Sequence, residues 1–262
     1  MKRMFRLSAA VLSLALALTL AGCLPGSETI KSGFHFDSRG DGICAVTGVE
    51  TAPKDAVGYL FVPETSGLGD RVTEIADGAF SGYYKVENVS IPAGIVRIGE
   101  SAFFRCSELK YVTLPETVTE IGPSAFRYCT SMIELSVNGP VETIGEYAFF
   151  GCRKLSAVTL CEGVVEIGKM AFDGCASLIE ITLPDSVRVI DRFAFGGCEE
   201  LMSVSIGKNV ERIGGYAFFG CVGLTDILYE GTVEEWGEIE FGDEWDNATG
   251  RYVVHCSDGD II

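Results

Sequence analysis

The stretch LIEITLPDSVRVIDRFAFGGCEE, Leu178 to Glu200, is one copy of a 23-residue unit that recurs along most of the chain. Four apolar columns keep this spacing without a gap, and they begin at Val72, Ile75, Phe80 and Val86. One such unit cannot bury its apolar side chains alone, whereas stacked units bury them against each other. The period therefore predicts a solenoid, with seven full copies from Val72 to Thr232.

Within the unit, apolar and polar residues alternate from Ile181 to Leu183 before Pro184, which predicts a short strand. The stretch VRVI predicts a second short extended segment. In RFAFGGC, Arg192 to Cys198, the spacing of the small and apolar residues indicates a single turn of helix. We therefore expect an α/β solenoid of seven 23-residue turns, with short parallel strands on one face and short helical turns on the other.

The first 22 residues have the features of a signal peptide, because basic residues precede an apolar run from Leu7 to Leu20. That run is too short to span a membrane with confidence. The ending LAGC, Leu20 to Cys23, resembles the lipobox of bacterial lipoproteins, which implies cleavage before Cys23 and a lipid on Cys23. An ordinary secretory signal with an incidental cysteine is the alternative.

The rest of the chain divides at the limits of the repeats. We expect the following parts: a lipidated N-terminus and tether at 23–33, N-terminal capping turns at 34–71, seven repeats at 72–232 and a C-terminal cap at 233–262.

The unit resembles the BspA-like leucine-rich repeats of bacterial surface proteins, almost continuously over residues 72–232. The departures are mild: Tyr83 replaces the first cysteine of the pattern, and four units lack its proline, with Asn138, Cys161, Gly207 and Glu230 in that position. The resemblance implies a curved, parallel-stranded solenoid with a role in binding, and it supplies no catalytic residues.

Acidic residues dominate the composition, with 37 Asp and Glu against 20 Lys and Arg and a formal net charge of −17. Such a surface repels phosphate backbones and anionic lipid headgroups, which disfavours nucleic acid as a partner. Attachment to a membrane would then depend on the lipid at Cys23 rather than on charge.

One column of the repeat consists of cysteine: Cys106, Cys129, Cys152, Cys175, Cys198 and Cys221. Side chains that point in parallel do not converge on a zinc ion, and they are poorly placed for disulfides. We therefore favour a buried packing column, in which a serine would find no hydrogen-bond partner. The pairing of Cys44, Cys161 and Cys256 stays open.

Two surfaces are candidates for binding a partner. The first is the outward face of the strands, with the predicted contact residues Asn88, Tyr111, Thr113, Glu134, Thr159, Glu180, Thr182 and Asp226. The second is an aromatic patch on the opposite flank, formed by Tyr147, Phe150, Met170, Phe193, Tyr216 and Phe219. An exposed aromatic patch would be unusual for a monomer, and rings packed over neighbouring turns are the alternative.

No motif of a catalytic, metal or cofactor site emerges. The two histidines, His35 and His255, lie near opposite ends of the chain, and the RGD tripeptide at Arg39 to Asp41 lies in a stretch typical of a turn. We expect a lipid-anchored, extracytoplasmic, monomeric protein without cofactor or enzymatic activity, which binds a protein or glycan partner. A structural surface spacer without a specific ligand is the alternative.

Overall fold

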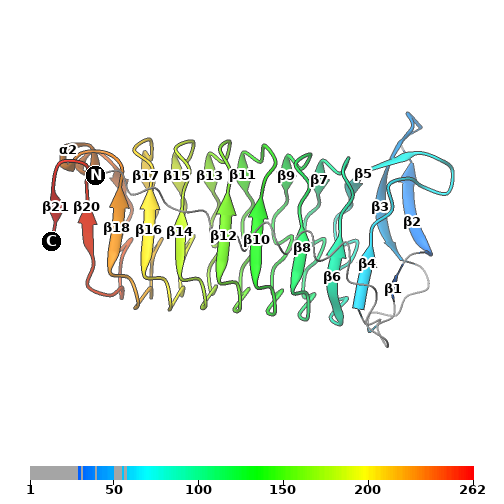
Figure 1. Ribbon diagram of the computed structural model, residues 1–262, viewed down its shortest axis with the longest axis horizontal. Coiled ribbons are helices and arrows are strands. Elements are labelled where there is room, and N and C mark those ends of the chain that lie inside the picture. The colour runs from blue at the N-terminus through cyan, green and yellow to red at the C-terminus, as the bar shows by residue number, and fades with distance from the viewer. Residues whose placement is uncertain (1–28, 31, 39, 50–54, 56–57) are drawn as a thin grey trace, which may run out of the picture.

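The computed structural model describes residues 29–262 apart from 31, 39, 50–54 and 56–57. The predicted signal peptide and Cys23 lie outside the described residues, as does Arg39 of the RGD tripeptide. The described chain forms a solenoid of about eight turns, in which two rows of short strands run along the molecule (Figure 1).

From β6 to β18, the first strand row carries the longer strands, and the row pairs in parallel except at its last strand. Its strands are β1 (Thr29–Ile30), β4 (Gly58–Phe61), β6 (Val86–Ser90), β8 (Tyr111–Thr113), β10 (Glu134–Val137), β12 (Ala157–Leu160), β14 (Glu180–Thr182), β16 (Ser203–Ile206), β18 (Asp226–Tyr229), β20 (Val253–His255) and β21 (Asp260–Ile261). β8 and β10 are neighbours, but the ladder is interrupted between them, so this row consists of two sheets.

The second strand row is one continuous sheet. Its strands are β2 (Phe34–Ser38), β3 (Ile43–Val49), β5 (Arg71–Ile75), β7 (Arg97–Ile98), β9 (Glu120–Ile121), β11 (Thr143–Ile144), β13 (Glu166–Ile167), β15 (Val189–Ile190), β17 (Arg212–Ile213) and β19 (Glu240–Phe241). The two rows correspond to the two extended segments predicted in each unit.

The array is longer than the seven predicted turns because both caps continue the parallel pairing. β3 pairs with β5 before the repeats, and β18 pairs with β20 after them. Antiparallel hairpins then close the two ends, β2 with β3 and β20 with β21. These hairpins protect strand edges that would otherwise pair with other chains.

The prediction of helical turns on the flank opposite the strands is wrong. α2 (Val233–Gly237), in the C-terminal cap, is the one helix among the described residues. In the repeats, left-handed backbone at both ends of the flank segment prevents a helix, as at Tyr147 (φ 58°) and Gly151 (φ 70°). The amide of Phe149 donates to the carbonyl of Ala171 in the next turn at 2.8 Å. The flank is therefore a ladder of turns bonded between units.

The predicted apolar columns form the core, which confirms the inward assignment. The phenylalanines of the column that begins at Phe80 are fully buried and form one continuous stack, with ring centroids of neighbours 5.1 Å apart at the closest pair and 5.5 Å at the widest. Phe34 covers the first ring of this stack, Phe80, and Trp245 covers the last, Phe218. Each ring therefore depends on the units before and after it.

The six cysteines of the column are fully buried, which confirms the packing interpretation. Each thiol donates a hydrogen bond to the carbonyl of the phenylalanine 26 residues earlier, as Cys175 does to Phe149 at 3.4 Å. The prediction that a serine in this column would lack a hydrogen-bond partner is therefore wrong, because a backbone carbonyl lies beside each of the six sulfurs. Burial raises the pKa of Cys106 and Cys152 to about 12.

Candidate functional site

The predicted binding residues lie on successive strands of the first row, from β6 to β18. Parallel pairing sets Asn88 beside Tyr111 and Glu180 beside Ser203. From β8 to β18, residues that face the core alternate with outward residues, and Asn88 of β6 pairs with the outward Tyr111, so these side chains share the outer face, called the strand face here. Four of them are exposed, namely Thr113, Thr159, Glu180 and Thr182, and the other four are half-buried.

The strand face is acidic and rich in hydrogen-bonding groups. Between β6 and β18, all of which is described, the paired outward rows carry Glu134, Glu180 and Asp226 and no Lys or Arg. Within the described residues, no hydrogen bond or ion pair engages the side chains of Thr159, Glu180 or Thr182. These groups are available to a partner, whereas the rows beneath them form the core.

Asp226 differs from the other predicted residues because its side chain contacts the C-terminal cap. It accepts a hydrogen bond from Thr225 at 2.7 Å, and it lies 3.0 Å from Nε2 of His255. Nδ1 of His255 lies 2.9 Å from Asp260. The bonds from Thr225 and His255 lower the pKa of Asp226, and the two carboxylates raise the pKa of His255. Asp226 thus joins β18 to the closing hairpin.

Three apolar side chains at one edge of the strand face were missed from the sequence. Ile133, Ile179 and Met202 each follow a buried residue of the fourth apolar column, and the exposed fraction of Met202 reaches 51%. The signal was present, because pairs such as Leu178–Ile179 break the alternation that the strand requires. These residues add apolar contact area next to the hydroxyl groups.

The aromatic patch predicted on the flank consists of rings that pack on each other across turns, as the packing alternative expects. Phe193 stacks on Tyr216 with centroids 4.9 Å apart, and Phe219 lies edge-on to Phe193 at 6.0 Å. The guanidinium of Arg127 lies 4.8 Å from the ring centroid of Tyr147. Of the six predicted residues, Phe219 is exposed and the others are half-buried. The flank therefore offers less free aromatic surface than the sequence indicates.

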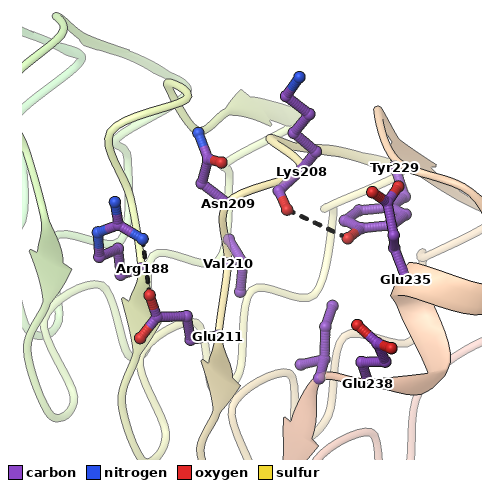
Figure 2. Close-up of a pocket in the computed structure, with 9 residues that line it drawn as sticks. Arg188, Lys208, Asn209, Val210, Glu211, Tyr229, Glu235 and Glu238 are labelled. Carbon is purple, nitrogen blue, oxygen red and sulfur yellow. Dashed lines mark hydrogen bonds and ion pairs between the residues drawn. The ribbon is translucent and has the colours of Figure 1, made fainter.

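A groove of about 340 Å³ lies where the last repeats meet α2 (Figure 2). Its polar groups largely bond to one another: Arg188 pairs with Glu211 at 2.6 Å, and the Tyr229 hydroxyl donates to the Lys208 carbonyl at 3.3 Å. Glu235 accepts the Thr232 amide in the capping box that starts α2. The side chain of Lys208 points away from Glu235 and Glu238 in Figure 2. The groove is thus mainly a junction between repeat and cap.

The described residues contain no cluster of three or more His, Cys, Asp or Glu side chains placed to hold a metal ion. His35 and His255 lie on β2 and β20, at opposite ends of the array (Figure 1). Within the described part of the chain, no helix has the length and apolar character needed to cross a membrane.

Solved structures with the same architecture come from bacterial proteins. The chain is similar to a leucine-rich repeat protein of T. pallidum, with 25% identity, a TM-score of 0.57 and coverage of 82% of this chain and 86% of that one. A leucine-rich repeat protein from Bacteroides ovatus shares the fold at 21% identity, with a TM-score of 0.56 and coverage of 85% and 71%. No curated protein matches the chain.

The family is defined by the repeat itself. The family model described as the BspA type leucine rich repeat region matches residues 64–164 and 119–244, with six copies. These matches cover more than half of the chain and coincide with the stacked turns. The chain belongs to the BspA-type leucine-rich repeat family.

Proposed function

We propose that this chain is a lipid-anchored, extracytoplasmic binding protein that recognises a protein or glycan partner through the strand face, without catalysis. The single observation that carries the proposal is the regular register of that face from β10 to β18, where the strands belong to one sheet. Hydroxyl and carboxylate groups recur in register on neighbouring strands, at a spacing of about 4.8 Å that an extended partner can follow.

The part of the strand face between β8 and β14 is best suited to a partner. Its exposed groups, Thr113, Thr159, Glu180 and Thr182, have no role in the core, so their interactions remain for a ligand. Ile179 and Met202 add apolar area at the edge, which matches the mixture of polar and apolar groups at protein interfaces. A spacer without a ligand has no requirement for such a combination on one face.

The strand face is tested with a matched pair of double variants. We expect Glu180→Ala with Thr182→Ala to reduce binding to arrayed glycans or extracellular proteins by about tenfold or more, because both side chains are exposed on the strand face. The control is Glu142→Ala with Thr143→Ala, an equally exposed pair on the side of the second strand row. Equal losses in both variants would contradict the assignment of the face. A failure of the unmodified protein to bind any probe would favour the spacer.

The anchor requires a separate test, because Cys23 lies outside the described residues. We expect the mature protein to begin at Cys23 and to sediment with membranes, since a lipid on that residue supplies apolar chains that the acidic protein lacks. Cys23→Ala is expected to shift the protein to the soluble fraction or to block its processing. Intact-mass measurement of an unmodified, soluble protein that starts at another residue would refute the anchor.

A further inference from the structure

A shallow depression of about 470 Å³ lies on the turns that lead into β6, β8 and β10, away from the strand face. Two tyrosines, Tyr84 and Tyr128, line it together with Arg105, Gly82 and two hydroxyl groups. The tyrosines are two turns apart, which places them roughly 10 Å apart along the stack with Arg105 between them. Tyr84 is exposed over 43% of its surface, so one ring is open to a ligand.

Arg105 is the charged group of this depression, and it is exposed. Its guanidinium lies 5.2 Å from the ring centroid of Phe104 and 5.9 Å from that of Tyr128. Among the described residues, no carboxylate lies within ion-pair distance of it. In a chain with a net charge of −17, an arginine held by aromatic rings but not neutralised by an acid is available to an anionic ligand.

The surroundings of the depression are basic although the chain is acidic. The flank segments 81–85, 104–108, 127–131 and 150–154 contain one acidic residue, Glu108, and the following cations: Lys85, Arg105, Arg127, Arg153 and Lys154. The next two segments reverse the sign, with Asp173, Glu199 and Glu200 and no cation. Burial raises the pKa of Asp173 to about 6, in keeping with a poorly solvated site there. Within these six segments, the cations thus lie at the end of the flank that holds the depression.

The two hydroxyl groups are oriented by the backbone. The hydroxyl of Ser107 donates to the carbonyl of Tyr84 at 3.4 Å, and that of Thr130 donates to the carbonyl of Ser107 at 3.2 Å. Because their protons are engaged, their oxygen lone pairs are left to accept hydrogen bonds from a ligand. The depression therefore presents acceptors for hydroxyl groups, an arginine for a carboxylate and aromatic faces for a ring.

We propose that this depression binds a carboxylated sugar unit of an acidic glycan. The carboxylate would pair with Arg105, the apolar face of a sugar ring would lie on Tyr84, and the sugar hydroxyls would donate to Ser107 and Thr130. The site is separate from the strand face, which is acidic and would repel the same ligand. The inference therefore does not depend on the function proposed for that face.

A sugar fits the observations better than a nucleic acid. A nucleic acid needs a cationic track along its densely charged backbone, whereas the cations here end after the fourth flank segment and acidic residues follow. A glycan with one carboxylate per unit matches a single unpaired arginine between two rings. Oxygens that can only accept also suit sugar hydroxyls better than the phosphodiesters of a nucleic acid, which have no proton to donate at neutral pH.

The test uses trigalacturonate as the acidic probe and its methyl ester as a neutral probe of the same shape, with binding measured by calorimetry on the purified protein. We expect the acid to bind and the ester to bind at least about tenfold more weakly, since the ester cannot pair with a guanidinium. Binding of the acid should weaken as salt is raised. A comparison of sialyllactose with lactose tests whether a different carboxylated sugar also binds at this site.

Two variants connect the binding to the depression. Arg105→Gln, which removes the guanidinium but keeps a polar, uncharged side chain at this exposed position, is expected to lower the affinity for trigalacturonate by about tenfold or more. Arg153→Gln, an exposed arginine of the same flank outside the depression, is the matched control and should change affinity by less than about twofold. Thermal unfolding verifies that both variants remain folded.

The inference would be overturned if neither carboxylated sugar bound, if acid and ester bound equally, or if both variants lost affinity to the same extent. Displacement of trigalacturonate by a single-stranded oligonucleotide at lower concentration would assign the surface to nucleic acid instead. The Glu180→Ala, Thr182→Ala variant distinguishes this site from the strand face, because it should bind trigalacturonate as tightly as the unmodified protein.

Discussion

Replacing Phe172 by alanine is expected to lower the free energy of unfolding by about 3 to 5 kcal/mol. The ring is fully buried and stacks on Phe149 at 5.3 Å and on Phe195 at 5.5 Å. Its removal leaves a cavity in the middle of the array. The neighbouring turns cannot easily collapse into this cavity, because their pairing with further turns holds them in place. Denaturant unfolding followed by circular dichroism measures the loss.

Phe219→Ala is the matched control, since it removes the same side chain from an exposed position of the flank. Its ring is exposed over 40% of its surface and contacts Phe193 and Tyr216. We expect a loss of about 1 kcal/mol from these aromatic contacts. Similar losses at Phe172 and Phe219 would mean that the inward and outward assignments of the flank are wrong.

The unfolding of the Phe172 variant should also be less cooperative. In a solenoid each turn is stabilised mainly by its neighbours, so a weakened central turn separates the two halves of the array energetically. We therefore expect a broader transition than for Phe219→Ala, which leaves the central stack intact. The position of Phe172 in the middle of the ring column is the reason for this difference.

The core residues of this fold could be predicted from the sequence, because equivalent positions in successive units of a solenoid have the same surroundings. The column that contains Phe172 and the column that contains Leu178 keep the 23-residue period, and both are fully buried in the structure. A period of this kind identifies inward positions without any knowledge of the turns between them. Burial in the repeats could therefore be predicted residue by residue.

The backbone of the flank could not be predicted in the same way. The spacing of Ala194, Phe195 and Cys198 suits one turn of helix, but the amide of Phe195 bonds to Ala217 in the next turn at 2.8 Å. Phe193, just before this segment, has left-handed backbone with φ 55°, which costs energy for a side chain of this type. Contacts between units outweigh the local preference, and a single unit gives no sign of them.

The strand face was predictable as a surface, but its limits were not. The rows from Asn88 to Thr182 follow the period, whereas the cap that engages Asp226 does not. Asp226 pairs with Val253, beyond the 23-residue spacing, because α2 and the loop after it are inserted there. The contact between Asp226 and His255 depends on this insertion, so no repeat pattern indicates it.

The buried cysteines give the second large effect. In native protein at pH 8, we expect the column thiols to react with iodoacetamide at least about a thousandfold more slowly than an ordinary cysteine. Burial raises the pKa of Cys106 and Cys152 to about 12, so very little of the reactive thiolate is present, and raising the pH toward that value should speed the reaction. Cys161, which is only half-buried, is the internal control.

Mass spectrometry of peptides after timed labelling measures each site separately. Denaturation without reductant should make all six column thiols reactive, because the unfolded chain no longer excludes solvent from them. If the column thiols of the folded protein reacted as fast as Cys161, their burial would be refuted. If the column thiols stayed unreactive after denaturation, a covalent link between them would be indicated instead.

A disulfide between Cys152 and Cys175 in protein kept from oxygen is the result that would contradict the thiol column most directly. Cys152 donates to the carbonyl of Phe126 at 3.3 Å and Cys175 to that of Phe149 at 3.4 Å, so the two sulfurs occupy equivalent positions in successive turns. A bridge would have to turn one side chain toward the other and break these hydrogen bonds inside the core, where an unpaired carbonyl is costly. We therefore expect Cys152 and Cys175 to remain as free thiols, although they lie in neighbouring units.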